Sequence, residues 1–119
     1  MIIDDSSTML MSLKNSLEIA GYKVLTAADG AIALRELVGG AKPDLIITDI
    51  NMPNMGGIEF IGKARALGGF RFTPILALTT ESQQTTRDEA KKLGATGWLL
   101  KPVSGADLQK IIKQVLPGA

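Results

Sequence analysis

The sequence predicts a three-layer α/β fold, in which a doubly wound parallel sheet of five strands carries helices on both faces. Short apolar runs alternate with segments of helical periodicity, and this alternation is typical of right-handed β-α-β units. Several of the apolar runs end in charged residues, in Asp4-Asp5, in Asp49 and in Lys101. The carboxyl ends of parallel strands are where such sheets present side chains to ligands, so the pattern indicates a site as well as a fold.

Five apolar runs are predicted to form the strands. Residues 45–47 are the most uniformly apolar and therefore predict the central strand. Only three residues precede Asp4, so the first strand is predicted to be shortened. The strands are expected at residues 1–3, 22–26, 45–48, 74–79 and 97–100.

Short polar side chains are placed to cap the helices, and glycines are placed to end them. Ser6 or Ser7 can cap the first helix, Asp29 the second and Ser82 the fourth. A capping box at residues 104–107 begins the fifth, and the third follows a loop dense in turn residues. The predicted helix ends are Gly21, Gly39-Gly40 and Gly94. Apolar residues at helical spacing in the third and fifth helices are Ile58, Ile61, Ala64, Leu108, Ile111, Ile112 and Val115.

Length and composition fit one domain spanning residues 1–119. A chain of 119 residues with 45% apolar residues can bury a core but is too short for a second domain. No apolar stretch approaches the roughly 20 residues that span a bilayer. The start of the chain is acidic where a signal peptide would be basic, so we expect a cytoplasmic protein without membrane contact.

Cysteine and histidine are both absent, which excludes several classes of catalytic and metal site. There can be no disulfide, thiol nucleophile or cysteine zinc site, and no histidine base. Carboxylates, hydroxyls and lysines remain to carry chemistry, and carboxylates favour Mg²⁺, Mn²⁺ or Ca²⁺ over softer metals.

The net charge of +1 gives no reason to expect nucleic-acid binding. Charge is unevenly distributed, however, because residues 1–60 hold eight acids and four bases while residues 61–119 hold four acids and nine bases. The cationic half could steer an acidic partner, and the alternative is that these charges are only solvated helix faces.

In the strand order 2-1-3-4-5 the first and third strands are neighbours, which would bring Asp4, Asp5 and Asp49 together. Clustered carboxylates repel one another unless a cation lies among them, and Mg²⁺ suits such a site. Beside a divalent metal, Asp49 is a competent nucleophile toward phosphorus, and Lys101 could neutralise the transferring group. A hydroxyl donor would come from Thr79. Taken alone, Asp4-Asp5 could also be a helix-capping pair, and Thr79 a simple strand residue.

The set Asp4-Asp5, Asp49, Thr79 and Lys101-Pro102, with Asn51-Met52-Pro53 after Asp49, resembles the receiver domain of bacterial response regulators. The resemblance covers essentially the whole chain and is strongest to the stand-alone chemotaxis regulators of the CheY type. It implies a flavodoxin-like fold and a phosphorylation-activated switch of a two-component system. Such a switch is not an enzyme beyond catalysing its own phosphorylation and dephosphorylation.

The resemblance also implies a role for each site residue. Asp49 would accept phosphate from the phosphohistidine of a sensor histidine kinase or phosphotransfer protein. Mg²⁺, for which Mn²⁺ or Ca²⁺ can substitute, would be bound by Asp5, Asp49 and the backbone carbonyl of Asn51, with Asp4 acting through water. Lys101 would pair with the phosphoryl group, and the Lys101-Pro102 bond would be cis.

On phosphorylation, Thr79 would turn toward the phosphoryl group and Trp98 would follow it inward. This motion would change the affinity of the surface formed by the fourth helix, fifth strand and fifth helix for a downstream protein. The flagellar motor switch is one candidate target. Without the resemblance, Trp98 would be read as a core or interface aromatic. The protein is expected to be a monomer that does not bind nucleic acid directly. Basic residues on the expected surface are Arg87, Lys91, Lys92, Lys110 and Lys113.

Two other interpretations share much of this pattern. One is a receiver domain from a longer regulator with a DNA-binding or enzymatic output domain. The other is a phosphatase similar to haloacid dehalogenases, which also uses a strand-end aspartate, a lysine and Mg²⁺. Those enzymes need an acid two residues after the nucleophile, and Asn51, which stands there, cannot transfer a proton.

Overall fold

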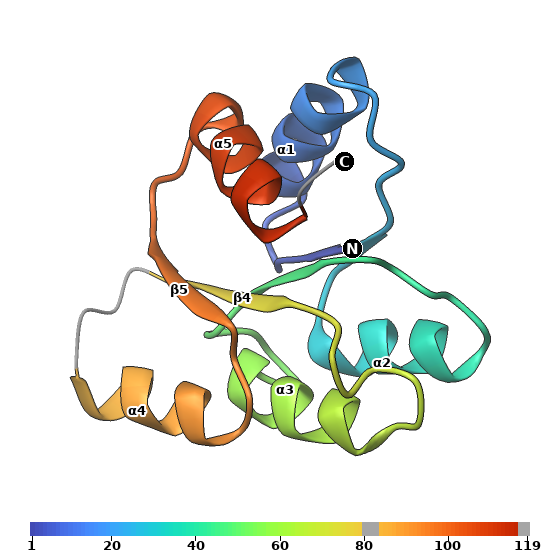
Figure 1. Ribbon diagram of the computed structural model, residues 1–119, viewed down its shortest axis with the longest axis vertical. Helices are drawn as coiled ribbons and strands as arrows, with labels where there is room; N and C mark the ends of the chain where they lie inside the picture. The colour runs from blue at the N-terminus through green and yellow to red at the C-terminus, as the bar shows by residue number, and fades with distance from the viewer. Residues whose placement is uncertain (80–83, 117–119) are drawn as a thin grey trace.

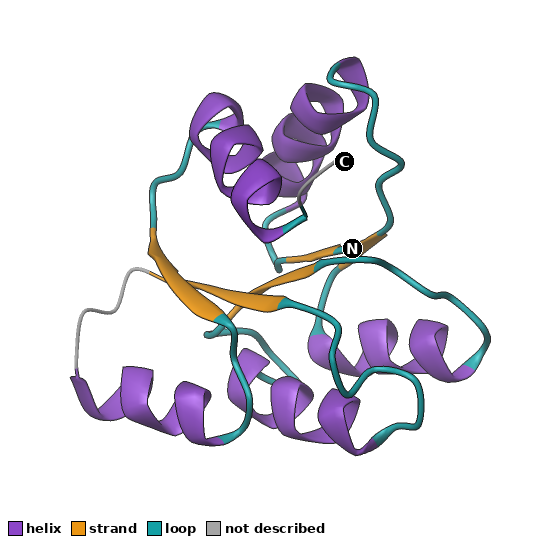
Figure 2. Ribbon diagram, in the orientation of Figure 1, coloured by secondary structure: helices purple, strands orange, loops and turns teal. Residues whose placement is uncertain are grey.

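The computed structural model describes residues 1–79 and 84–116, and of residues 84–87 it describes the backbone alone. Five parallel strands form one sheet in the order β2-β1-β3-β4-β5, which confirms the predicted fold class and strand order. Figure 1 shows α1 and α5 on one side of the sheet and α2, α3 and α4 on the other. Figure 2 draws the helices of both outer layers in purple and the strands between them in orange. The strands are β1 (Ile2–Ile3), β2 (Thr26–Ala27), β3 (Ile46–Asp49), β4 (Ile75–Thr79) and β5 (Gly97–Leu100). The helices are α1 (Ser7–Ile19), α2 (Gly30–Val38), α3 (Gly57–Ala66), α4 (Gln84–Lys92) and α5 (Gly105–Val115).

The prediction of a strand at residues 22–26 was wrong for most of its length. In the structure β2 begins only at Thr26, because β1 is two residues long and offers partners only to Thr26 and Ala27. A strand forms only where a neighbouring strand can pair with it. Before Thr26, the bond from the Ile2 amide to the Leu25 carbonyl is the one backbone hydrogen bond with β1 in the described residues. The predicted shortening of the first strand is confirmed.

The helix caps agree with the polar pattern of the sequence. Ser6 accepts a hydrogen bond from the amide of Met9, and Asp29 accepts one from the amide of Ile32. Ser104 likewise caps α5. The glycines 21, 40 and 94 that follow helix ends have positive φ, which a residue without Cβ adopts most easily. Ser82, the expected cap of α4, lies outside the described residues.

Two apolar clusters hold the layers together, one on each face of the sheet. On one face Phe60 and Ile61 of α3 are fully buried against Ile46 and Ile75. On the other, α1 and α5 bury Leu13, Leu17, Leu108 and Ile112. None of the helices in the described ranges is both long and apolar enough to cross a membrane.

Arg65 is a hydrogen-bonding hub between α3 and two loops. Its guanidinium donates to the carbonyls of Gly94, Phe70 and Thr73. We expect Arg65→Ala to lower the free energy of unfolding by about 2–4 kcal/mol, because it leaves several carbonyls without donors. Chemical denaturation would measure the loss.

A matched control for this prediction lies in the same helix. Lys63 is about half exposed and forms a surface ion pair with Glu59, so Lys63→Ala should change stability by no more than about 0.5 kcal/mol. Similar losses for Arg65→Ala and Lys63→Ala would contradict the role given to the Arg65 guanidinium.

The amino group of Met1 is buried at the start of β1, where it donates to the carbonyl of Leu45 at 2.8 Å. Burial lowers its pKa from the ordinary 8.0 to about 6, although Asp44 opposes the shift. The folded chain therefore binds this proton more weakly than the unfolded chain. Stability from this group is complete above pH 8 and is lost as the pH falls toward 6, by about 2–3 kcal/mol. Denaturation at both pH values would measure this loss.

Acetylation of the Met1 amine provides the control, since it removes the charge and keeps an N–H donor. The acetylated chain should lack this component of the pH dependence. If the free and acetylated chains lose the same stability between pH 8 and 6, the buried amine is not its source.

Candidate functional site

The strand register brings the predicted residues to one edge of the sheet. Ile3 pairs with Thr48, so Asp4 and Asp49 follow at the same level of neighbouring strands. Thr79 pairs with Leu100 at the ends of β4 and β5, and the amide of Lys101 donates to the Thr79 carbonyl at 2.8 Å. Each of these side chains thus stands at or just beyond the carboxyl end of its strand, as expected for a ligand site in such a sheet.

The three carboxylates form a compact group. One oxygen from each of Asp4, Asp5 and Asp49 lies within 4.8 Å of the others. Asp4 and Asp49 are buried, whereas Asp5 is exposed. The Nζ of Lys101 lies 2.9 Å from Asp4 Oδ2 and 3.0 Å from Asp49 Oδ2, and its side chain is only 15% exposed. The predicted convergence of three acids and one lysine is therefore present in the structure.

Backbone amides fix the orientation of the two buried carboxylates. Asp4 Oδ1 accepts from the amide of Ser6 at 2.9 Å, and Asp49 Oδ1 accepts from the amide of Ile50 at 2.8 Å. In each carboxylate the second oxygen, Oδ2, is the one that contacts Lys101. The two Oδ2 atoms are thus the ones available to meet a ligand at the lysine.

Burial shapes the protonation of the site. Burial raises the pKa of Asp49; the hydrogen bond from Lys101 opposes this, and the negative charge of Asp4 adds to it. Burial by itself would lower the pKa of Lys101, but its bonds to Asp4 and Asp49 outweigh it and the pKa rises. Lys101 therefore stays charged. The ionised form of Asp49 is disfavoured by burial, and a further positive charge nearby would stabilise it.

The remaining predicted residues lie in β4, in β5 and in the loops that follow the strands. Thr79 is fully buried at the end of β4, and Trp98 is half-buried in β5, where it pairs with Ala77. Asn51 is exposed in the loop after Asp49. The peptide bond between Lys101 and Pro102 is cis.

The donor set fits a hard divalent cation. It consists of carboxylate oxygens, which Mg²⁺ prefers over nitrogen or sulfur ligands. The carbonyl oxygen of Asn51 accepts no hydrogen bond from any residue in the described ranges, so it can serve as a further oxygen ligand. The exposure of Asp5 leaves an approach for water and for phosphate oxygens.

Sequence reasoning missed two features that support the site. Gly57 begins α3, and a Cβ there would overlap the carbonyl oxygen of Asp49. Asn54 has φ +64° and donates from its side chain to Asp29, at the start of α2. Gly57 ends the run of turn residues that the sequence places before the third helix, and this run was the available signal. The bond between Asp29 and Asn54 left no mark in the sequence.

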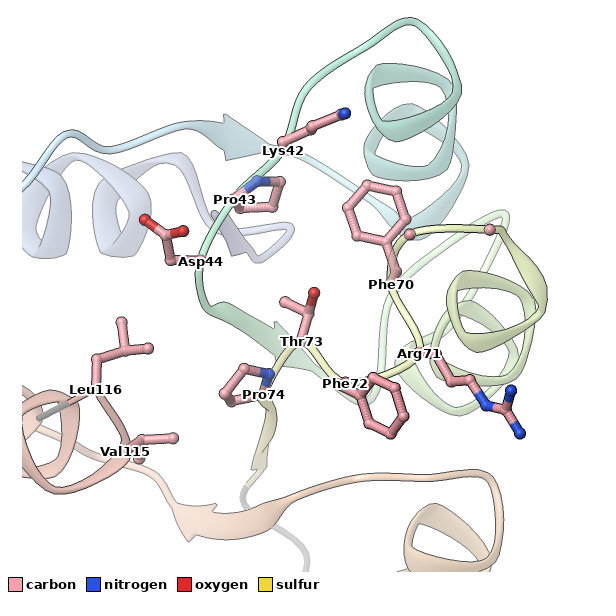
Figure 3. A pocket seen from close by; sticks show the side chains of 12 residues that line it. Lys42, Pro43, Asp44, Phe70, Arg71, Phe72, Thr73, Pro74, Val115 and Leu116 are labelled. Carbon is pink, nitrogen blue, oxygen red and sulfur yellow. The ribbon is translucent and has the colours of Figure 1, made fainter.

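A separate hollow lies away from this site and differs from it in chemistry. It encloses about 930 Å³ between the segments before β3 and β4 and the end of α5. Figure 3 shows Phe70, Phe72 and Val115 among its lining residues, with Asp44 as the labelled acid. Among the residues that the structure describes, its lining contains one carboxylate, that of Asp44, so it lacks the clustered acids that a cation site needs.

Comparison with known proteins agrees with the geometry. Residues 1–113 match the response regulator receiver domain family. The chemotaxis protein CheY1 of Helicobacter pylori strain J99 is 37% identical over 117 residues, which cover 98% of this chain and 94% of that protein. The structure of the chemotaxis protein CheY4 of Vibrio cholerae is similar with a TM-score of 0.91 at 44% identity, covering 97% of this chain and 95% of that chain.

Another solved structure with a similar fold contains a bound metal ion. The receiver domain of the sensor histidine kinase PA1611 from Pseudomonas aeruginosa, with a magnesium ion coordinated in its active site cleft, has a TM-score of 0.85 at 29% identity. It covers 95% of this chain and 92% of that chain. The match over residues 1–113 and the relatives of nearly equal length show that this chain belongs to the response regulator receiver family and is of the CheY type.

Proposed function

We propose that Asp49 is the phosphoacceptor of this receiver and that its phosphorylation depends on Mg²⁺. One observation carries the proposal: the lysine ammonium contacts the Oδ2 atoms of two buried aspartates at the carboxyl edge of the sheet. A phosphoryl group attached to Asp49 would lie where Lys101 can neutralise it. CheY-type receivers are signalling switches that act with histidine kinases and downstream proteins, rather than classical enzymes.

The orientation of Asp49 identifies its reacting oxygen. Oδ1 is held by the Ile50 amide, so Oδ2 would attack phosphorus. The new bond joins Oδ2 to phosphorus, and the bond from phosphorus to the donor breaks, its electron pair leaving with the imidazole nitrogen of a phosphohistidine. Lys101 would then exchange its contact with Asp49 for one with a phosphoryl oxygen. The chain would in this way promote only its own phosphorylation and dephosphorylation.

Asp5, Asp49 and the Asn51 carbonyl would hold Mg²⁺, with Asp4 acting through a bound water. When bound, Mg²⁺ supplies positive charge that offsets the charge developing on the transferred phosphoryl oxygens. The magnesium ion coordinated in the PA1611 receiver domain supports this assignment.

Thr79 and Trp98 would transmit the modification. The Thr79 hydroxyl would donate to the phosphoryl group, and Trp98 would move toward the space it leaves, biasing the α4, β5 and α5 surface between two states. Lys91, Lys92 and Lys110 are exposed on this surface, which favours an acidic partner. Similarity to chemotaxis proteins supports the flagellar motor switch as the target. The chain would act as one cytoplasmic, monomeric domain spanning residues 1–119.

Intact mass measurement tests the phosphoacceptor directly. With Mg²⁺ and a small-molecule phosphodonor, the wild type should gain one phosphoryl group, and Asp49→Ala should gain none. Asp44→Ala, which removes an exposed acid at the other edge of the sheet, should be labelled normally. Equal labelling of the wild type and Asp49→Ala would show that another residue accepts the phosphate. Turnover of a phosphomonoester would instead support the phosphatase interpretation.

A further inference from the structure

Asp29 makes two contacts, of which only one is needed to cap a helix. Its Oδ1 accepts from the amide of Ile32 at 2.9 Å, the usual bond of an N-cap. Its Oδ2 accepts at 3.0 Å from the side-chain amide of Asn54, which lies 25 residues later in the loop between β3 and α3. Asp29 is only 6% exposed, and the bond from Asn54 is the foremost cause of its lowered pKa. The second contact therefore joins α2 to the loop that follows Asp49.

A backbone contact reinforces this junction. The amide of Gly30 donates to the carbonyl of Met55 at 3.1 Å, and a Cβ on Gly30 would lie 2.9 Å from the same carbonyl oxygen. The first turn of α2 thus packs closely on the loop. Asn54 itself has φ +64°, a conformation that asparagine tolerates better than most residues.

The loop from Ile50 to Gly57 is thereby attached at two places. At its base the amide of Gly57 donates to the carbonyl of Ile50 at 2.9 Å. At its tip Asn54 and Met55 are held by α2. Asn51 lies between these attachments, so the position of its carbonyl depends on both.

We propose that Asp29 and Asn54 are positioning residues, whose hydrogen bond holds the loop after Asp49 so that the Asn51 carbonyl can bind the divalent cation. The inference rests on the proposed function, because it assumes that the cation binds beside Asp49. Residues that orient metal ligands from outside the coordination sphere commonly change metal affinity by about 10-fold to 100-fold when they are replaced. The bond between Asp29 and Asn54 would act in this way through the loop backbone.

Two substitutions separate positioning from helix capping and backbone strain. Asp29→Ser keeps an N-cap hydroxyl but removes the acceptor for Asn54. Asn54→Gly removes the donor, and glycine adopts φ +64° without strain. Calorimetric titration with Mg²⁺, at a temperature where every variant is folded, should show about tenfold weaker binding for each. Amide exchange at Gly30 should be faster in both variants.

A double substitution tests whether the bond itself is responsible. In Asp29→Asn with Asn54→Asp, the new amide at position 29 can donate to the new carboxylate at position 54 while its oxygen caps α2, so Mg²⁺ affinity should return toward the wild-type value. Wild-type affinity in the single variants, or failure of the exchanged pair to recover the loss, would overturn the inference. If the inference is overturned in either way but the wild type is phosphorylated normally, the proposed function stands. If the wild type does not bind Mg²⁺, both fail.

Discussion

Replacing Lys101 with methionine is expected to destabilise the protein without Mg²⁺ by about 3 kcal/mol and, at the same time, to strengthen Mg²⁺ binding. The side chain is 15% exposed and pairs with Asp4 and Asp49, both buried. Removing one partner of a buried ion pair leaves uncompensated charge, which costs more than the pair itself contributes. The methionine keeps most of the aliphatic volume, so the loss would report charge rather than packing.

The affinity for Mg²⁺ should change in the opposite direction because Lys101 and the cation compete for the same carboxylates. Without the ammonium, the negative potential at Asp4 and Asp49 rises, and a divalent ion gains more by entering. Chemical denaturation with and without Mg²⁺, together with calorimetric titration, would measure both effects. The same concentration of Mg²⁺ should raise the free energy of unfolding of Lys101→Met by more than it raises that of the wild type.

Two variants serve as controls for this experiment. Lys110→Met removes an exposed lysine of α5 and should leave stability and Mg²⁺ affinity almost unchanged. Lys101→Met combined with Asp49→Asn removes one charge of each sign and should recover part of the lost stability. Weaker Mg²⁺ binding in Lys101→Met would mean that the lysine supports the cation rather than competing with it.

The sequence was sufficient for the elements whose signals are local. The apolar residues of β3 and β4 and the caps Asp29 and Ser104 were recognised because each depends on a few neighbouring residues. β2 was mispredicted because its length is set by a partner, β1, that is remote in the sequence. Strand length in a parallel sheet is a property of pairs, which a single run of residues does not contain.

The same distinction applies to the site. Asp4, Asp49 and Lys101 could be brought together from the sequence because strand ends and strand order suffice to place them at one edge. The contact between Asp29 and Asn54 could not, since it joins a helix cap to the tip of a loop. The positions of the reacting side chains can be predicted from strand order. The positions of the side chains that support them depend on close packing, which the sequence pattern does not reveal.

Gly57→Ala tests how closely packing controls the reacting group. Gly57 is the first residue of α3, and its φ is not in the left-handed region, so helix propensity alone would make alanine stabilising by about 1 kcal/mol. A Cβ at this position would, however, overlap the carbonyl oxygen of Asp49 and lie 3.0 Å from the Asp49 carbonyl carbon and the Ile50 Cα. These are backbone atoms and cannot rotate away, so we expect a net loss of about 3 kcal/mol in the free energy of unfolding.

The shift that relieves this overlap must move the backbone that carries Asp49. Misplacing a reacting group by about 1 Å can slow a reaction about 100-fold, so phosphorylation of Gly57→Ala should slow by between about tenfold and 100-fold. Gly68→Ala is the matched control, because a Cβ at Gly68 would have nothing within 4 Å. Denaturation and time-resolved intact mass would measure both effects. Because helix propensity and steric overlap predict opposite signs, a stability of Gly57→Ala equal to or above that of the wild type would mean that the close approach to Asp49 does not constrain the site.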